Sequence, residues 1–272
     1  MSSLINRIFD LLKGSRQTLV VWCLCFAGLI VINILVHNQA TVLRSVDLFF
    51  YDMLLRYKPV AAEQQIVVIE IDDKSLSSLG RWPWSRDKHA QLLEQINPHQ
   101  PKAIFLDILF TEPSQDNQAD VQLAKALQTS SNLVLPVLLS PKEGGILDLS
   151  KPERIDVYEP IPLFSQHVLI GHAGNQPDWD SVVRQVQMNL NVGGHSLKNV
   201  MAIMANQEPS GENLLIPYRG IAGRFNHYSY VDVLEGRGPA QSFQGKYVLV
   251  GASASGLGDI NRTPFGLMPG VE

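Results

Sequence analysis

The sequence has 272 residues, of which 45% are hydrophobic and 18% are charged, and its formal net charge is −4. This length allows one large domain or two small domains, with enough apolar side chains for a sizeable core. The first 36 residues hold three basic residues and one acid, so the remainder has 19 basic and 25 acidic residues, and this excess of negative charge argues against nucleic acid as a partner.

Residues 18–36 form an apolar segment without a charged residue, and its length is close to the minimum for a helix that crosses a bilayer. The segment is longer than the apolar region of a cleaved signal peptide, and it lacks the polar face that a core helix usually keeps. Three basic residues precede it against one acid, so the positive-inside rule places the N-terminus in the cytoplasm. We therefore expect a cytoplasmic segment over residues 1–17, a transmembrane helix over residues 18–36, and the remainder outside.

A second helical pattern follows the apolar segment. Residues 40–57 place apolar side chains at helical spacing, and Pro59 ends the pattern. No proline interrupts the chain from the anchor to this point, so the anchor can continue into a juxtamembrane helix, which we assign to residues 37–58. Its apolar stripe must be covered, either by the rest of the chain or by a second copy in a homodimer.

Apolar runs alternate with helical patterns after residue 58. Short runs of apolar, mostly β-branched residues predict buried strands, and apolar residues at helical spacing after a capping residue predict helices. The predicted strands are residues 66–71, 103–109, 133–139 and 247–250, and the predicted helices are residues 86–96, with Ser85 as N-cap, and 116–129. Two consecutive β-α-β units predict a single α/β domain over residues 59–272, with a mostly parallel central sheet flanked by helices.

The middle of the chain carries weaker patterns. Residues 140–162 are rich in proline, glycine and charge, and predict a long surface excursion. Alternation over residues 182–192 predicts a half-exposed strand, and apolar residues at helical spacing predict a helix over residues 196–206. Ser229 and Asp232 fit a capping box that opens a further short helix.

Acidic residues stand at the ends of predicted strands. Asp72 and Asp73 follow the first strand, Asp107 lies near the end of the second, and Asp259 follows the last. Because the carboxyl ends of parallel strands share one edge of a sheet, we expect Asp72, Asp107 and Asp259 at the edge where open α/β sheets bind ligands. Three carboxylates there can hold Mg²⁺ or Ca²⁺, but strand-end acids also serve as caps and turn formers, and both interpretations stay open.

Aromatic, basic and glycine-rich positions complete the set of candidates. Trp82 and Trp84 form either an aromatic wall for a ligand or a cap on the core, and Arg86 is expected to pair with a nearby acid. The glycine-rich segment 251–258 either turns tightly or presents backbone amides to an anionic ligand. The sequence predicts no catalytic residue and no cofactor, and it leaves a metal undecided. The candidate ligand-binding residues are Asp72, Asp73, Asp107, Trp82, Trp84, Arg86 and Asp259.

These segments also carry a family resemblance. Residues 71–86 read IDDKSLSSLGRWPWSR, and FLDILF follows at residues 105–110. This combination resembles the second type of CHASE domain, a family of extracellular sensor domains in bacterial receptors. The resemblance extends over residues 47–272 and includes Tyr228-Ser229-Tyr230, GKYVLVGASASGLGD, Arg262-Thr263-Pro264 and Pro269-Gly270-Val271.

The resemblance implies a sensory function. It predicts a module that detects an unknown extracellular ligand at the periplasmic side of the bacterial inner membrane and controls a cytoplasmic cyclase, kinase or diguanylate cyclase/phosphodiesterase. The chain ends at Glu272 without a second apolar span, so we expect either that it is truncated, which we favour, or that it acts through a partner. The alternative is a membrane-anchored periplasmic hydrolase with a metal held by Asp72, Asp107 and Asp259, although the sequence offers it no recognisable nucleophile or base histidine.

Overall fold

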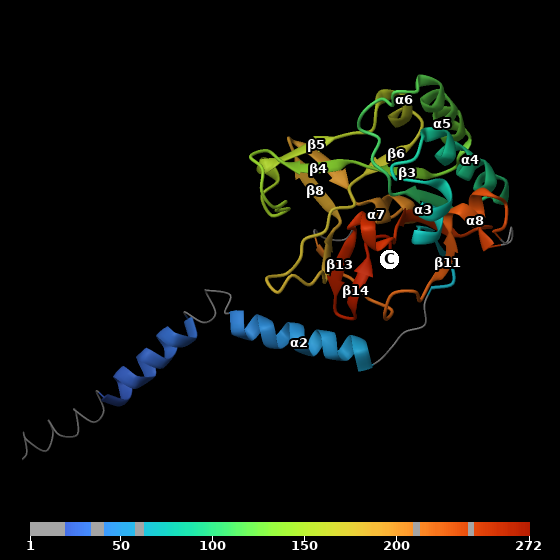
Figure 1. Cartoon of the computed structure of the whole chain (residues 1–272). Helices are drawn as coiled ribbons and strands as arrows, with labels where there is room; N and C mark the ends of the chain where they lie inside the picture. Colours follow the sequence, from blue (N-terminus) through green and yellow to red (C-terminus); the bar gives the residue numbers. More distant parts are fainter. Residues whose placement is uncertain (1–19, 34–40, 58–62, 209–212, 239–241) are drawn as a thin grey trace, which may run out of the picture. The chain divides into compact units, whose positions relative to one another are not determined.

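The computed structural model describes residues 20–33, 41–57, 63–208, 213–238 and 242–272 (Figure 1). The chain forms two compact units, residues 1–54 and residues 55–272. In the first unit, residues 20–33 are helical and exposed. Within the described part of the chain, no helix is both long enough and apolar enough to cross a membrane. The ends of the predicted transmembrane segment 18–36 lie outside the described residues.

The helix α2 (Thr41–Tyr57) begins and ends within one residue of the helix predicted over residues 40–57. Its sequence contains neither proline nor glycine, the two residues that most disfavour a helix interior. The apolar side chains that it exposes are Val46, Phe49, Phe50, Met53, Leu54 and Tyr57.

The second unit is built on a six-stranded sheet in which every neighbouring pair of strands is parallel. The strand order is β11-β1-β12-β2-β3-β6. This sheet holds all four predicted strands and confirms the mostly parallel α/β fold. Its strands are β1 (Ile66–Ile71), β2 (Ala103–Leu106), β3 (Leu133–Pro136), β6 (Leu169–Gly171), β11 (Asn226–Ser229) and β12 (Tyr247–Ala252).

The apolar character of these strands follows from burial on both faces of the sheet. In β1, Val67 and Ile69 pack into the larger core, whereas Val68 packs into a second core on the opposite face. A strand that is covered on both sides has no polar face, so its sequence is a continuous apolar run rather than an alternation of apolar and polar residues.

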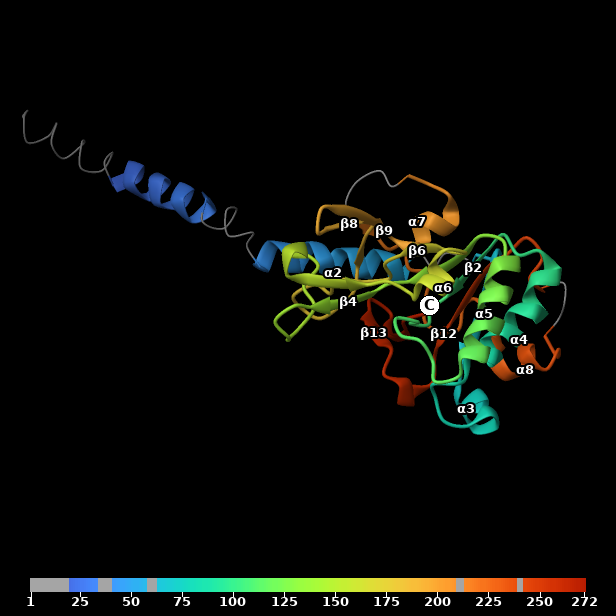
Figure 2. The ribbon, with the colours of Figure 1, turned by 90° about the horizontal axis from the view of Figure 1, so that it is seen from above.

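Helices α4 (Arg86–Ile96) and α5 (Asn117–Thr129) cover the larger core and lie side by side (Figure 2). Ser85 is the N-cap residue of α4 as predicted, and Asp116 caps α5 by accepting hydrogen bonds from the backbone N–H groups of Gln118 and Ala119. The short helices α6 (Pro162–Ser165) and α8 (Tyr230–Leu234) bury side chains in the same core. Helix α3 (Asp73–Leu79), which the sequence did not predict, precedes α4.

The opposite face of the sheet carries the smaller core. Helix α7 (Val200–Ala205) packs Val200 and Met204 there against residues of the sheet. Val271 joins this core from the segment that follows a hairpin, whose strands are β13 (Ile260–Thr263) and β14 (Gly266–Pro269). The predicted arrangement of helices on both faces of the sheet is therefore confirmed.

Several predicted boundaries are wrong. Residues 107–109 leave the sheet after β2, and residues 138–139 belong to β4 (Leu138–Pro141), which pairs with β5 (Ile155–Tyr158) inside the predicted surface excursion. The predicted helix 196–206 begins only at Val200, because β9 (His195–Lys198) forms a hairpin with β8 (Asn189–Val192). Gly193 and Gly194 form the turn of this hairpin at positive φ. The hairpin therefore forms where the spacing of apolar residues had predicted the start of a helix.

The remaining elements are short. Strand β7 (Gln185–Gln187) pairs with β10 (Asn213–Leu215), so the predicted strand 182–192 is divided between two small sheets. The 3₁₀ turns are η1 (Asn97–His99), η2 (Pro152–Arg154) and η4 (Ser255–Leu257).

The strand order places a topological switch point in the middle of the sheet. The chain passes from β1 to β2, and the late strand β12 then fills the position between them. In open α/β sheets, ligands bind outside the carboxyl ends of strands at such a point. The carboxyl ends of β1, β12 and β2 therefore mark the place to search for a site.

Candidate functional site

Ionisable side chains from distant parts of the chain gather at this edge, on the face that α7 covers. Glu70 lies on β1 two residues after Val68, so the two side chains share a face. His227 on β11 pairs with Val68 in the sheet register and therefore lies on that face too. Asp107 follows β2, and its backbone N–H extends the ladder by donating to the carbonyl of Val250 at 2.8 Å.

Two glycines let the segment after β14 close onto the sheet. A Cβ placed on Gly251, which pairs with Glu70 in the register of β12, would lie 2.8 Å from Cγ2 of Val271. A Cβ placed on Gly270 would overlap the carboxylate of Asp259. Because both positions lack a side chain, Val271 packs on β12 and the Asp259 carboxylate lies against the backbone of Gly270.

Asp107 and the segment after β14 line a cavity of about 320 Å³, which we call the acidic cavity. Its carboxylates are Asp107, Asp259 and Glu272, and Asn175, Asn199 and Asn261 add amide groups. Apolar side chains from the sheet, α7 and the β13–β14 hairpin form most of the remaining wall. The part of the wall that the structure describes contains no lysine, arginine or histidine, so the cavity favours positive charge in an occupant.

Burial, together with the smaller effect of the neighbouring charge of Asp259, raises the pKa of Asp107 to about 7. Burial also raises the pKa of Asp259. Among the described residues, none donates a hydrogen bond to either carboxylate. Desolvation of a carboxylate without a compensating donor favours its neutral form, which is the physical cause of both shifts.

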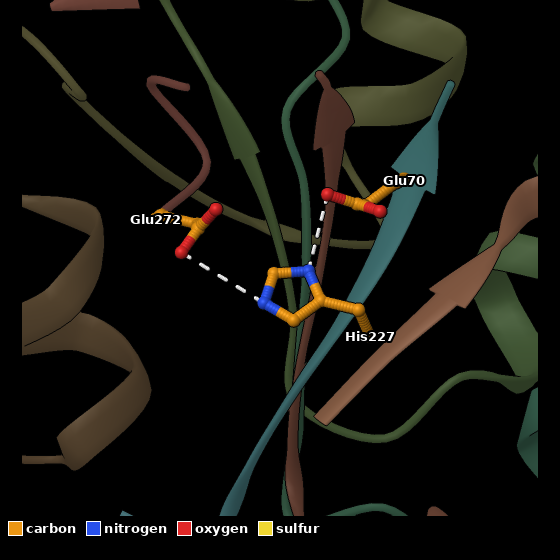
Figure 3. A group of neighbouring side chains, drawn as sticks. All are labelled: Glu70, His227 and Glu272. Atoms are coloured by element: carbon orange, nitrogen blue, oxygen red, sulfur yellow. Dashed lines mark ion pairs between the residues drawn. The ribbon is translucent and has the colours of Figure 1, made fainter. Parts of the chain in front are cut away.

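Beside the cavity, Glu70, His227 and Glu272 form a connected group (Figure 3). The Nδ1 atom of His227 lies 3.1 Å from Oε1 of Glu70, and its Nε2 atom lies 3.8 Å from Oε2 of Glu272. The Glu272 carboxylate also accepts a hydrogen bond of 2.7 Å from the backbone N–H of Gly223. The hydrogen bond to Glu70 raises the pKa of His227, and the charges of Glu70 and Glu272 act in the same direction against burial.

The three side chains bring donor atoms within 4.8 Å of one another, as a metal site would require. However, Figure 3 shows the imidazole ring between the two carboxylates, each of which faces a different ring nitrogen. One metal ion would need both carboxylates on the same nitrogen's side. The geometry therefore fits an ion-pair network that ties β1, β11 and the segment after β14 together.

Asp72 does not belong to the acidic cavity. It is the N-cap residue of α3, where its carboxylate accepts hydrogen bonds from the backbone N–H of Ser75 at 2.8 Å and from the hydroxyl of Ser229 at 2.9 Å. Asp73 is exposed in the first turn of α3. This placement corrects the prediction that Asp72, Asp107 and Asp259 share one site, because only Asp107 and Asp259 line the cavity. Ser229 is the N-cap residue of α8, so the predicted short helix begins where expected. Its hydroxyl donates to Asp72 and makes no cap hydrogen bond to α8, so the predicted capping box does not form.

We expect the substitution Asp72→Ala to lower the free energy of unfolding by about 1–2 kcal/mol, because α3 loses its cap. The measurement is denaturant unfolding of the full chain in detergent micelles, followed by tryptophan fluorescence. Asp73→Ala, at the exposed neighbouring position, is the matched control and should lower the free energy of unfolding by less than Asp72→Ala. Equal costs for the two variants would contradict the capping role.

Trp82, Trp84 and Arg86 lie against the larger core rather than in the cavity. Trp84 is 7% exposed, donates from Nε1 to the carbonyl of Gly80 at 3.0 Å, and packs on Tyr230 with ring centroids 4.8 Å apart. Trp82 meets Trp84 edge to face. The two tryptophans therefore cap the core.

Arg86 has the acidic partner that the sequence predicted. Its Nε donates to Asp120 at 3.1 Å, and its guanidinium lies 4.6 Å from the centre of the Phe110 ring. It also donates to the carbonyl of Glu112 at 2.8 Å. These contacts hold the start of α4 against α5 and leave Arg86 outside the cavity.

Glu70, His227 and Glu272 are functional candidates that the sequence interpretation missed. Glu70 offered a local signal, since it is the one charged residue in the apolar run of β1. His227 and Glu272 offered none, because their positions depend on which distant strands become neighbours. The glycine-rich segment begins inside β12, and the carboxylates around it argue against an anionic ligand.

The family comparison agrees with the resemblance noted in the sequence. The model of the CHASE2 domain matches residues 25–272. No curated protein and no solved structure matches the chain. Because the family match covers most of the sequence, the chain belongs to the CHASE2 domain family of extracellular sensory domains.

Proposed function

We propose that this chain is the sensory part of a bacterial transmembrane receptor and that its stimulus is a ligand bound in the acidic cavity. The observation that carries the proposal is the CHASE2 match over residues 25–272. The output domain is a cytoplasmic cyclase, kinase or diguanylate cyclase/phosphodiesterase that lies beyond these residues. The cavity supports the ligand assignment because it lies on the face of the sheet that α7 covers, reaches Asp107 after β2, and combines apolar walls with a few carboxylates.

The membrane arrangement is part of the same proposal. The uncharged segment 18–36 serves as the anchor, its basic flank stays in the cytoplasm, and the sheet domain is periplasmic. The lipid bilayer is thus one partner of the chain. A second copy is another, because the apolar stripe of α2 needs a cover in water.

A contact within the second unit supports a route from the cavity toward the membrane. Arg56, near the end of α2, donates from Nε and Nη2 to the carbonyl of Pro264 at 2.8 and 2.5 Å. Pro264 lies in the turn of the β13–β14 hairpin, next to Thr263, which lines the acidic cavity. A ligand that binds two positions of the hairpin with different affinity would bias Arg56 and, through it, α2.

Reporter fusions test the membrane arrangement. Alkaline phosphatase, which needs an oxidising compartment to form its disulfides, is expected to be active when it is joined after Glu272, and a green fluorescent protein at the same point is expected to be dark. The same reporters joined after Gln17 should give the reverse result. Fluorescence after Glu272 with silent phosphatase would place this domain in the cytoplasm and refute the proposal.

A further inference from the structure

We propose that the acidic cavity binds a small organic cation, an amine with an apolar body whose ammonium group lies between Asp107 and Asp259. The inference rests on the proposed function, in which the cavity is the sensing site, and it assigns the chemical class of the ligand. It follows from the charges of the cavity, from its walls and from its size.

The two aspartates lack a counter-charge. Both line the cavity, and within the described part of the chain no side chain or backbone N–H donates to either carboxylate. Glu272 differs, because it accepts a hydrogen bond from Gly223 and lies beside His227. Asp107 and Asp259 are half-buried. A carboxylate that is partly withdrawn from water and has no donor loses hydration without a compensating hydrogen bond, so these two are the groups that a cationic ligand would satisfy.

The walls favour a hydrocarbon body over a bare metal ion. Covering apolar surface contributes about 25 cal/mol per Å², and a metal ion leaves that contribution unused. The carboxylates and amides of the wall offer oxygen atoms that a Ca²⁺ ion could use, so the apolar share of the wall is what favours an organic cation. An anion would be repelled by the carboxylates of Asp107, Asp259 and Glu272. The apolar wall includes Phe105, Val200, Met201, Ile216, Leu249 and Met268.

The size of the cavity limits the ligand further. A volume of about 320 Å³ lies at the small end of ligand pockets in proteins. A compact monoamine fits this volume, with its ammonium group at the aspartates and its hydrocarbon part toward α7 and the hairpin. The amides of Asn175 and Asn261 can accept further hydrogen bonds from the ammonium group.

Three compounds with one hydrocarbon body test the charge requirement: cyclohexylamine, cyclohexanol and cyclohexanecarboxylate. Isothermal titration calorimetry uses the full chain in non-ionic micelles at pH 8, with the heats from empty micelles subtracted. We expect the amine to bind at least about tenfold more tightly than the alcohol or the carboxylate, as charged hydrogen bonds contribute on this scale. Asp107→Asn and Asp259→Asn are each expected to weaken amine binding by about 10- to 100-fold. Glu94→Gln, at an exposed acid of α4, is the control and should leave it unchanged.

The possible outcomes separate this inference from the proposed function. Equal affinity for the amine and the alcohol, no measurable amine binding, or amine binding that both asparagine variants retain overturns the inference. Ca²⁺ binding that these variants abolish, without competition from the amine, overturns it as well. Ala173→Trp adds a large side chain at an exposed position of the cavity wall and should block any ligand there.

If the alcohol or the carboxylate binds and Ala173→Trp removes that binding, the cavity remains the sensing site and only the charge assignment fails. If none of the compounds binds and Ala173→Trp leaves signalling by the full-length receptor unchanged, the proposed role of the cavity fails too. Tight amine binding that Asp107→Asn, Asp259→Asn and Ala173→Trp all remove supports both.

Discussion

Replacing Asp107 with asparagine is expected to stabilise the domain at alkaline pH. Relative to the wild type, the variant should gain about 2–3 kcal/mol in free energy of unfolding between pH 5 and pH 8. The pKa of Asp107 is about 7 in the folded chain, against 3.8 for an ordinary aspartate. In this range the folded state holds a proton that the unfolded state has released, so the stability of the wild type falls as the pH rises toward 7. Asparagine does not ionise, so the variant lacks the part of the pH-dependent loss of stability that Asp107 causes.

The other ionisable groups at the site remain in both proteins, so the difference reports the titration of Asp107 together with its coupling to Asp259. They are Asp259, Glu272, Glu70 and His227. The raised pKa of His227 also makes stability fall as the pH rises above 6.5, but this fall is common to the two proteins. Denaturant unfolding at pH 5, 6, 7 and 8 measures the difference, and Glu94→Gln should follow the wild type. Parallel pH profiles for the wild type and Asp107→Asn would show that Asp107 is not held neutral by its surroundings.

A side chain whose removal stabilises the fold needs another reason to be present. Asp107 loses hydration and gains no donor within the described domain, so its contribution to folding at neutral pH is unfavourable. Strongly perturbed carboxyl groups that lie in a cavity are common at functional sites. Stability gained together with loss of amine binding would be the signature of a residue kept for the ligand.

The strands around this site could be predicted from local sequence. β1, β2, β3 and β12 are apolar runs buried on both faces, and such runs are identifiable without knowledge of their neighbours. The sheet edge on which Asp107 lies could also be predicted, because parallel strands have their carboxyl ends at the same edge. The order of the strands in the sheet could not be predicted. Glu70 and His227 meet because β11 pairs with β1, and no local pattern encodes a pairing across that much sequence.

The different fates of Asp72 and Asp107 have a local explanation. Both aspartates follow an apolar strand, but Asp72 is followed three residues later by Ser75, and its carboxylate accepts from the backbone N–H of that residue as an N-cap does. Asp107 is followed by apolar Ile108, Leu109 and Phe110, so no helix begins there and no cap is needed. The residues that follow each aspartate therefore distinguish a helix-capping carboxylate from one that is a candidate for ligand binding.

The partner of Asp107 could not be predicted in this way. Asp259 reaches the cavity because the β13–β14 hairpin folds back and because Gly251 and Gly270 leave space for the returning segment. Glycine-rich sequence after a strand signals a close approach of two backbones, but it does not say which segment approaches. The hairpin itself went unpredicted, since its strands are only four residues long and mix polar with apolar side chains.

The substitution Arg86→Ala is expected to give the largest loss of stability, about 3–5 kcal/mol in free energy of unfolding, without a change in amine binding. Arg86 is the counter-charge of Asp120, whose side chain is 4% exposed and keeps one other donor, the backbone N–H of Ser114 at 2.9 Å. Removal of the guanidinium leaves that carboxylate buried without a counter-charge and also removes the contact with the Phe110 ring.

Two further variants test this cause. Arg81→Ala removes an exposed arginine five positions earlier and is expected to change the free energy of unfolding by no more than about 0.5 kcal/mol. Asp120→Asn in the Arg86→Ala background removes the uncompensated charge, so the double variant should recover part of the lost stability. If the double variant were less stable than Arg86→Ala alone, the loss would come from packing rather than from the buried charge. A loss of amine binding in folded Arg86→Ala would return Arg86 to the ligand site, where the sequence alone had left it as a candidate.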